Sequence, residues 1–153
     1  MDAVDRKILA LLQEDAALSI EKIAIKVHLS STPCWKRIRR LEKDGVIQKR
    51  VALLDAEKVG AGVTVFVAIK TNQHNREWLD HFASSVEDMP EILDFYRMSG
   101  EIDYLLRVVV SDIAAFDDFY QRLISRVPLS DVTSSFAMEK IKHTTALPIA
   151  TTE

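Results

Sequence analysis

Residues 29–45 have the pattern of a short basic helix with a defined start and a defined end. A hydroxyl among residues 30–32 can cap the first turn, where Pro33 loses nothing by lacking a backbone N–H. Gly45 is the residue type that favours the position just past a helix. At about 100° per residue, one face of this helix is apolar and is predicted to be buried. That face consists of Cys34, Ile38 and Leu41.

The opposite face of the same helix is basic, and this favours contact with DNA. A charged helix face is commonly only solvated, but here it is nearly all of one sign and starts at a capped N-terminus. Side chains at the centre of the face would reach base edges or nearby phosphates, and those around it would contact phosphates. The predicted DNA-binding residues are Ser31, Thr32, Trp35, Lys36, Arg37, Arg39, Arg40, Lys43, Lys49 and Arg50.

Two shorter helices are predicted before this one. Residues 2–15 carry an apolar stripe at i, i+4, i+7 and i+8, with Asp2 and Asp5 at the positive end of the helix dipole. A second helix begins after Ser19, the predicted cap, and a short turn over residues 28–30 leads into the basic helix. Three short helices with such a turn are typical of a helix-turn-helix domain, here residues 1–50.

Charge is distributed unevenly along the 153 residues. Residues 1–50 hold 11 Lys and Arg against 7 Asp and Glu, whereas residues 51–153 hold 9 against 16. A basic third on an acidic remainder indicates two modules with different partners. The start of the chain is not a signal peptide and no apolar run is long enough to span a membrane, which predicts a cytoplasmic protein. The single cysteine, Cys34, is interpreted as a core residue, with a redox-sensing thiol as the alternative.

The second half of the chain predicts an α+β fold. Residues 46–54 are expected to form a strand or a two-stranded wing, and residues 51–62 a strand and linker. Residues 63–153 then follow the ferredoxin-like order β-α-β-β-α-β. Such a sheet has helices on one face only, so a dimer that packs sheet on sheet is expected to cover the other. The predicted class is thus a winged helix-turn-helix followed by a ferredoxin-like domain for effector binding and oligomerisation.

Four motifs, in this order and at these separations, resemble the Lrp/AsnC (feast/famine) family of transcriptional regulators. The motifs are DRKILALLQEDA, LSSTPCWKRIRRLEKDGVI, SGEIDYLL and DVTSSFAME. The resemblance implies a bacterial or archaeal regulator that binds a roughly palindromic site in double-stranded promoter DNA. It also implies that the C-terminal domain, called RAM, forms homodimers and larger oligomers, often octamers. A small amino acid is the implied effector.

The resemblance further implies that the effector binds in clefts between dimers. The residues carried over to this site are Met98, Ser99, Gly100, Asp103, Tyr104, Thr133, Ser134 and Ser135. An Asp carboxylate can accept from an ammonium group, and backbone N–H groups and hydroxyls can donate to a carboxylate. An ordinary β-turn is the alternative for residues 98–104. The segments TPCWKR, KRVALLD and SSFAMEKIKHTTALPI also resemble a branch of the family that responds to cysteine.

Other chemistries have weaker support. Four histidines lack the spacing and companions of a metal site, and no Gly-rich phosphate loop or activated nucleophile is recognisable, so no metal, cofactor or catalytic residue is predicted. An enzyme on the same scaffold, similar to the sirohaem decarboxylases, is the alternative function. Such an enzyme would have no use for an outward row of Lys and Arg on one helix.

Overall fold

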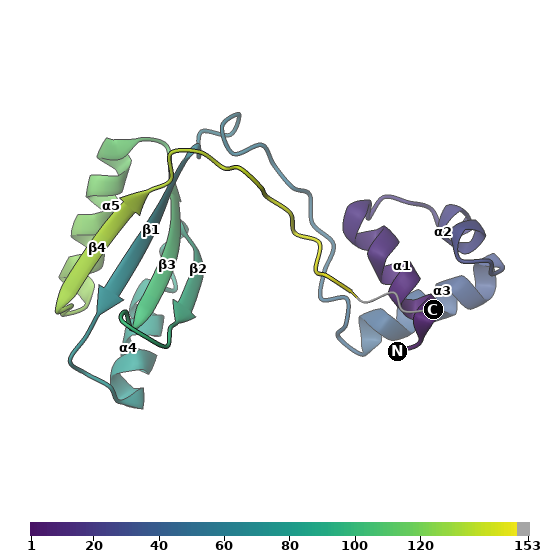
Figure 1. Cartoon of the computed structure of the whole chain (residues 1–153), viewed down its shortest axis with the longest axis horizontal. Coiled ribbons are helices and arrows are strands. Elements are labelled where there is room, and N and C mark those ends of the chain that lie inside the picture. Colours follow the sequence, from purple (N-terminus) through teal and green to yellow (C-terminus); the bar gives the residue numbers. More distant parts are fainter. Residues whose placement is uncertain (150–153) are drawn as a thin grey trace. The chain divides into compact units, whose positions relative to one another are not determined.

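The computed structural model describes residues 1–149, which form two compact units (Figure 1). The helical unit comprises Met1–Leu53 together with the C-terminal segment from Ile141, and the sheet unit comprises Leu54–Lys140. The sequence predicts a single domain over residues 63–153. The segment from Ile141 instead joins the helical unit, because Ile149 packs against its core and the backbone of Leu147 is hydrogen-bonded to Gln13.

The helical unit contains the three predicted helices. They are α1 (Ala3–Glu14), α2 (Ile20–Lys26) and α3 (Ser31–Lys43). Asp2 and Asp5 form a reciprocal capping box at the start of α1, and the Ser19 hydroxyl caps α2. Small aliphatic side chains fill the centre. Those that are at most 2% exposed are Ile8, Ile23, Ala24, Cys34, Ile38 and Leu41.

The burial of Cys34 agrees with its interpretation as a core residue. Its side chain lies in the apolar cluster with Ile38 and Leu41, and burial raises the pKa of its thiol. A raised pKa keeps the sulfur protonated, and the protonated form is the unreactive one.

The turn between α2 and α3 is held by the backbone. His28 adopts a left-handed conformation with φ of 58°, and the N–H of Leu29 donates to the carbonyl of Ala24 at 2.9 Å. Ser30 occupies the N-cap position of α3 without a hydrogen bond from its side chain. Gly45, with φ of 72°, follows the end of α3 as predicted.

The strand or wing expected over residues 46–54 is wrong for this structure, in which these residues are irregular. A strand needs a neighbour to pair with, and β-branched content alone does not supply one. Val51, Leu53 and Leu54 are more than half exposed. This segment, α1 and the C-terminal segment surround an open hollow of about 900 Å³ within the helical unit.

The sheet unit has the predicted order of elements, and the α+β class is confirmed. The elements are β1 (Val63–Lys70), α4 (Arg76–Val86), β2 (Ile92–Arg97), β3 (Tyr104–Val110), α5 (Ile113–Arg126) and β4 (Asp131–Phe136). The strands lie in the order β2-β3-β1-β4, with every pair antiparallel. Among the described residues, no helix is long and apolar enough to cross a membrane.

Helices α4 and α5 cover one face of this sheet (Figure 1). The core between them and the strands combines aliphatic side chains with a cluster of aromatic ones. Phe82 is fully buried, and its ring centroid lies 5.2 Å from Trp78 and 4.8 Å from Phe95. Alternate residues of β1 and β3 point into this core, as the period of two predicts. The core positions on these two strands are Val65, Val67, Ile69, Tyr104, Leu106, Val108 and Val110.

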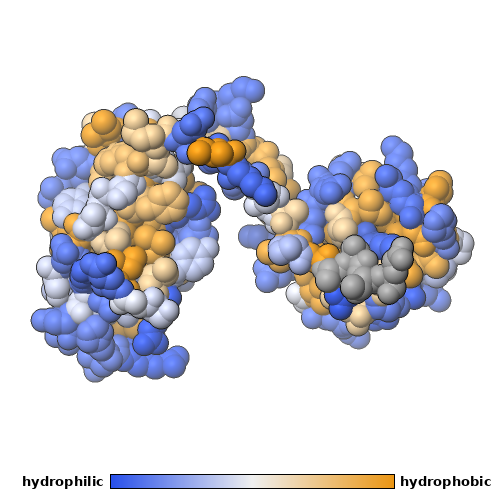
Figure 2. All heavy atoms as spheres, viewed as in Figure 1, coloured by the Kyte–Doolittle hydropathy of each residue, from blue (hydrophilic) through white to orange (hydrophobic). Residues whose placement is uncertain are grey.

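Among residues 1–149, no helix lies over the other face of the sheet. Figure 2 shows hydrophobic residues gathered across the sheet unit, with hydrophilic residues towards its margins. Phe66 on β1 is 39% exposed on this open face, and Arg107 pairs there with Asp94. A surface of this kind is typical of a protein–protein interface.

Candidate DNA-binding and effector sites

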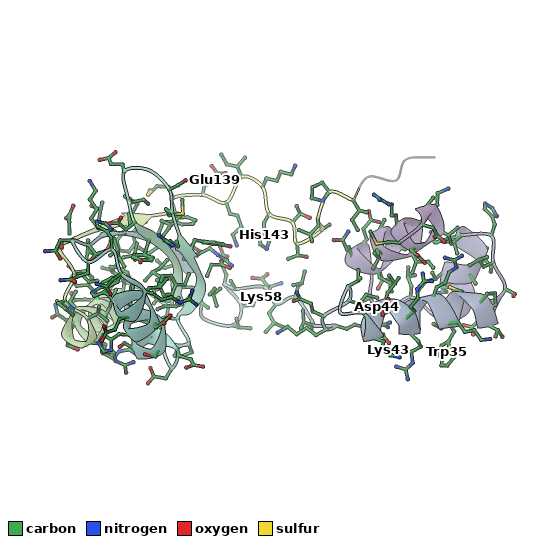
Figure 3. All side chains as sticks on the ribbon, turned by 90° about the horizontal axis from the view of Figure 1, so that it is seen from below. Trp35, Lys43, Asp44, Lys58, Glu139 and His143 are labelled. Carbon is green, nitrogen blue, oxygen red and sulfur yellow. The ribbon has the colours of Figure 1, made fainter. Side chains whose placement is uncertain are left out.

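The outer side of α3 presents an exposed basic row. Lys36, Arg39 and Lys43 lie opposite the buried stripe of the helix and are all exposed. The Arg39 guanidinium sits 5.8 Å from the ring centroid of Trp35, which is 48% exposed. Figure 3 shows Trp35 and Lys43 projecting from α3 away from α1. The row therefore faces solvent, where a DNA groove could reach it.

Most of these cations have weak partners or none. Within residues 1–149, Lys36, Lys43 and Lys49 make no ion pair. Arg39 and Arg50 both bind Glu42, at 3.2 and 3.1 Å. Surface pairs of this kind contribute little, so they are readily exchanged for phosphate. Ser31 and Thr32, at the leading end of α3, are exposed.

Arg37 and Arg40 point elsewhere, although the sequence placed them with the other DNA-binding cations. The Arg37 Nη1 donates to Asp2 at 2.6 Å and to Asp5 at 2.8 Å, and the Arg40 Nη2 donates to Asp5 at 2.6 Å. The Asp5 side chain is only 1% exposed. These contacts join the start of α1 to the middle of α3.

The same contacts lower the pKa values of both carboxyl groups. The backbone N–H of Asp5 and the Arg37 guanidinium lower the pKa of Asp2 to about 2. Burial by itself would raise the pKa of Asp5, but the backbone N–H of Asp2 and the Arg37 guanidinium outweigh it and hold that pKa below its ordinary value. Both carboxylates are therefore ionised at neutral pH.

The predicted effector residues around residue 100 form a tight turn between β2 and β3. The N–H of Met98 donates to the carbonyl of Asp103 at 2.8 Å, and Gly100 has φ of 129°, which a residue with a Cβ rarely adopts. The Asp103 carboxylate accepts from the N–H of Thr71 at 2.8 Å, and its second oxygen lies 3.6 Å from His74 Nδ1. Asp103 thus holds the turn against the end of β1.

Within one chain the eight predicted effector residues do not converge. Strand β1 separates β4 from β3, the strand that carries Tyr104. Ser134 pairs with the buried Val67 and so shares the helix-covered side of the sheet with Tyr104, whereas Thr133 and Ser135 lie on the open face.

Sequence reasoning missed two groups of residues near these sites. It assigned Asp2 and Asp5 to the helix dipole, although Asp5 lies one turn before Ile8 and Leu9 on a buried stripe. A carboxylate at such a position signals a buried ion pair. Thr71 and His74 are the loop residues that lie against Asp103. No pattern in the sequence indicates their role.

Two family models match the chain and divide it between them. Residues 1–48 match a model described as winged helix-turn-helix DNA-binding, and residues 64–147 match the Lrp/AsnC ligand binding domain. The first match contains the whole exposed row on α3. The second contains every strand of the sheet apart from the first residue of β1.

Similar proteins agree over nearly the whole length. The DNA-binding transcriptional activator DecR of Escherichia coli K12 is 58% identical over 150 residues, which are 97% of this chain and 99% of that protein. A crystal structure of an AsnC family transcriptional regulator from Agrobacterium tumefaciens is 59% identical, with a TM-score of 0.94 over 97% of both chains. A regulator from Neisseria meningitidis, solved in complex with L-Met, is 36% identical, with a TM-score of 0.92 over 98% of this chain and 97% of that one. The chain belongs to the Lrp/AsnC family of DNA-binding transcriptional regulators.

Proposed function

We propose that this regulator binds promoter DNA through the outer side of α3 and that a small amino acid alters this binding. The observation that carries the proposal is the solvent-facing row of Lys36, Arg39 and Lys43 beside Trp35. A helix of this length fits the major groove, where Arg and Lys donate to guanine. Because the matching proteins are regulators of transcription, an enzymatic role on this scaffold is set aside.

The remaining predicted contacts would set the register of α3 on the duplex. Ser31 and Thr32 stand at the N-terminus of α3, where hydroxyls can donate to phosphate. Lys49 and Arg50, beyond the end of the helix, are exposed and would add phosphate contacts. In a dimer two such surfaces would lie about one helical turn of DNA apart, so a roughly palindromic site is expected.

The DNA-binding proposal is tested by a salt titration. A duplex selected by the purified protein from a random library is titrated by fluorescence anisotropy between about 50 and 200 mM salt. The Lys36→Gln/Arg39→Gln variant is expected to bind more weakly, with a salt slope smaller by roughly 0.9 for each lost phosphate contact. Arg76→Gln is the matched control, because it removes one cation from the sheet unit, where its side chain is 91% exposed. Absence of binding by the wild-type protein, or a double variant identical to it, would refute the assignment.

A small amino acid is the proposed effector class, with cysteine as the first candidate. The match to a ligand binding domain supports the class, and so does the bound L-Met in the Neisseria relative. Cysteine rests on the resemblance of three sequence segments to the cysteine-responsive branch. The Asp103 oxygen that Thr71 does not use lies 3.6 Å from His74 Nδ1, and a carboxylate oxygen can accept from an ammonium group as well.

Because the predicted effector residues do not come together within one chain, we propose that a second copy of the chain completes the site. The open face of the sheet supports such pairing, since Phe66 and its neighbours expose apolar area there. A homodimer that assembles into a larger oligomer, with eight copies as the expectation from the family resemblance, follows from this. Phe66→Glu is expected to reduce the mass measured by light scattering, because a charge would be buried in the interface. An unchanged mass would remove the open face from the interface.

The effector site is tested with two variants of the same turn. Asp103→Asn removes the proposed ammonium acceptor, whereas Glu101→Gln removes a carboxylate that is 89% exposed. Calorimetric titration with cysteine, methionine and leucine is expected to show binding to the wild-type protein and to Glu101→Gln. Asp103→Asn should bind at least tenfold more weakly, in line with the loss of a hydrogen bond to a charged group. Equal binding by both variants would exclude Asp103.

A further inference from the structure

The five cations of α3 fall into two sets that differ in what they contact. Lys36, Arg39 and Lys43 face solvent, with Glu42 as their one ionic partner within residues 1–149. Arg37 and Arg40 instead reach the carboxylates at the start of α1. The second set is thus engaged with carboxylates of another helix, although the Arg40 side chain is still 50% exposed.

We propose that Asp5, assisted by Asp2, is a positioning residue for DNA recognition, which acts by fixing α3 against α1 through Arg37 and Arg40. The inference rests on the proposed use of α3 in DNA binding. It changes the role of Arg37 and Arg40 from DNA contacts to anchors of the helix that makes those contacts.

The geometry around Asp5 supports this role. Its carboxylate accepts from three donors, namely the N–H of Asp2 at 3.0 Å, Arg37 at 2.8 Å and Arg40 at 2.6 Å. Arg37 and Arg40 are three residues apart and so neighbour each other on the surface of α3. One buried carboxylate therefore holds two points on a single turn of the helix.

Two points of attachment restrict how α3 can move. The apolar cluster that holds Ile8, Ile38 and Leu41 is stabilised by non-directional burial, which by itself permits some rotation and sliding. Hydrogen bonds between charged groups add direction because they weaken quickly away from ideal geometry. A binding constellation tolerates misplacement of only about 0.5 Å or 10–20°. Loss of the Asp5 contacts should therefore displace Lys36 and Arg39 from their base edges.

The substitution Asp5→Asn separates this inference from simple electrostatics by the sign of its effect. If charge alone mattered, removal of an anion near DNA-binding cations would raise the affinity for DNA and steepen its dependence on salt. It would also free Arg40 for a phosphate. If Asp5 positions α3, the same substitution lowers the affinity for the selected site.

The experiment compares binding of a library-selected duplex and of a random-sequence duplex, each across a salt series. Asp5→Asn is expected to weaken binding to the selected duplex roughly tenfold, with little change on the random duplex, because base contacts depend on position more than phosphate contacts do. Arg40→Gln is expected to lose the same specificity with the wild-type salt slope. The Asp5→Asn/Arg40→Gln double variant should bind the selected duplex no more weakly than either single variant, because each of the three variants breaks the same contact between Asp5 and Arg40. Glu14→Gln is the matched control, as an exposed carboxylate on the same helix.

Each outcome decides a separate question. Tighter binding by Asp5→Asn, or a salt slope smaller by roughly 0.9 in Arg40→Gln, would show that Arg40 contacts phosphate and would overturn the inference alone. No binding by the wild-type protein would overturn the DNA-binding function and the inference with it. Circular dichroism checks that each variant folds. If Asp5→Asn does not fold, Arg40→Gln decides by itself: lost specificity at an unchanged slope supports the inference, and a reduced slope refutes it.

Discussion

Different interactions stabilise the interior of each of the two units of this regulator. The sheet unit encloses a core rich in aromatic side chains, in which Trp78, Phe82, Phe95 and Tyr104 contact one another. The helical unit has a core of small aliphatic residues, and its single aromatic residue, Trp35, is exposed on α3. Where the helical unit lacks apolar area, ion pairs from Asp2 and Asp5 supply directional contacts between its helices.

This contrast relates stability to function. The core of the sheet unit is close-packed and stabilises that unit through burial of apolar area. A recognition helix must be placed within narrow limits of angle and position. A buried carboxylate that binds two arginines restricts that placement at a cost in desolvation.

The first prediction concerns the aromatic core. Phe82→Ala should lower the free energy of unfolding of the sheet unit by about 3–5 kcal/mol, because the truncation leaves a cavity between α4 and the sheet. The emission of Trp78, whose ring centroid is 5.2 Å from Phe82, reports this in a urea titration. Ile113→Ala, at a position 72% exposed, serves as the control and should change stability by less than about 0.5 kcal/mol. Equal losses of unfolding free energy in Phe82→Ala and Ile113→Ala would contradict the placement of Phe82 in the core.

The second prediction concerns the ion pairs of the helical unit. Asp5→Asn should lower its stability by about 1.5–3 kcal/mol at neutral pH, the range for hydrogen bonds to charged groups. Because the pKa of Asp5 is lower in the folded state than its ordinary value of about 3.9, its contribution is present above about pH 4. That contribution is lost as the pH falls through the folded-state pKa.

The pH dependence makes this second prediction specific. Thermal melts followed by circular dichroism should show the difference between wild type and Asp5→Asn shrinking as the pH falls below about 4. Glu14→Gln, on the same helix, should follow the wild-type profile. A constant difference between wild type and Asp5→Asn down to the lowest pH would mean that Asp5 acts through packing rather than charge.

The third prediction compares two helix caps, one in each unit. The Asn75 side chain accepts from the N–H of Trp78 at 2.8 Å at the start of α4, whereas the Ser30 side chain caps nothing at the start of α3. Asn75→Ala should therefore cost about 1 kcal/mol and Ser30→Ala only a few tenths. Urea titrations of the two variants measure both values. A larger loss for Ser30→Ala would indicate a cap on α3 that this structure does not show.

The smallest expected effect is at the turn before α3. His28 has φ of 58°, a conformation that costs an L-residue roughly 1 kcal/mol and costs glycine little. His28→Gly should therefore raise the stability of the helical unit by about 0.5 kcal/mol once the greater entropy of glycine in the unfolded chain is counted. His28→Ala, which keeps a Cβ, should give no gain. A loss of stability in His28→Gly would show that the imidazole makes a useful contact.

Much of this protein follows from its sequence alone. The spacing of Cys34, Ile38 and Leu41 identified the buried face of α3, because a helix repeats every 3.6 residues whatever surrounds it. Alternation along residues 63–69 predicted the first strand of the sheet, because successive side chains of a strand point to opposite faces. The four family motifs depend on the order of residues and indicated a regulator of transcription that the comparisons then showed.

Which charged side chains of α3 are ion-paired depends on contacts between elements that are distant in the sequence. Arg37 and Arg40 look like Lys36 and Arg39 in sequence, and they differ because α1 brings Asp5 to one side of α3. Residues 46–54 have the composition of a strand, but within the described part of the chain, residues 1–149, no neighbouring strand pairs with them. Ion pairs and sheet ladders both need a partner from elsewhere in the chain, and local periodicity carries no information about that partner.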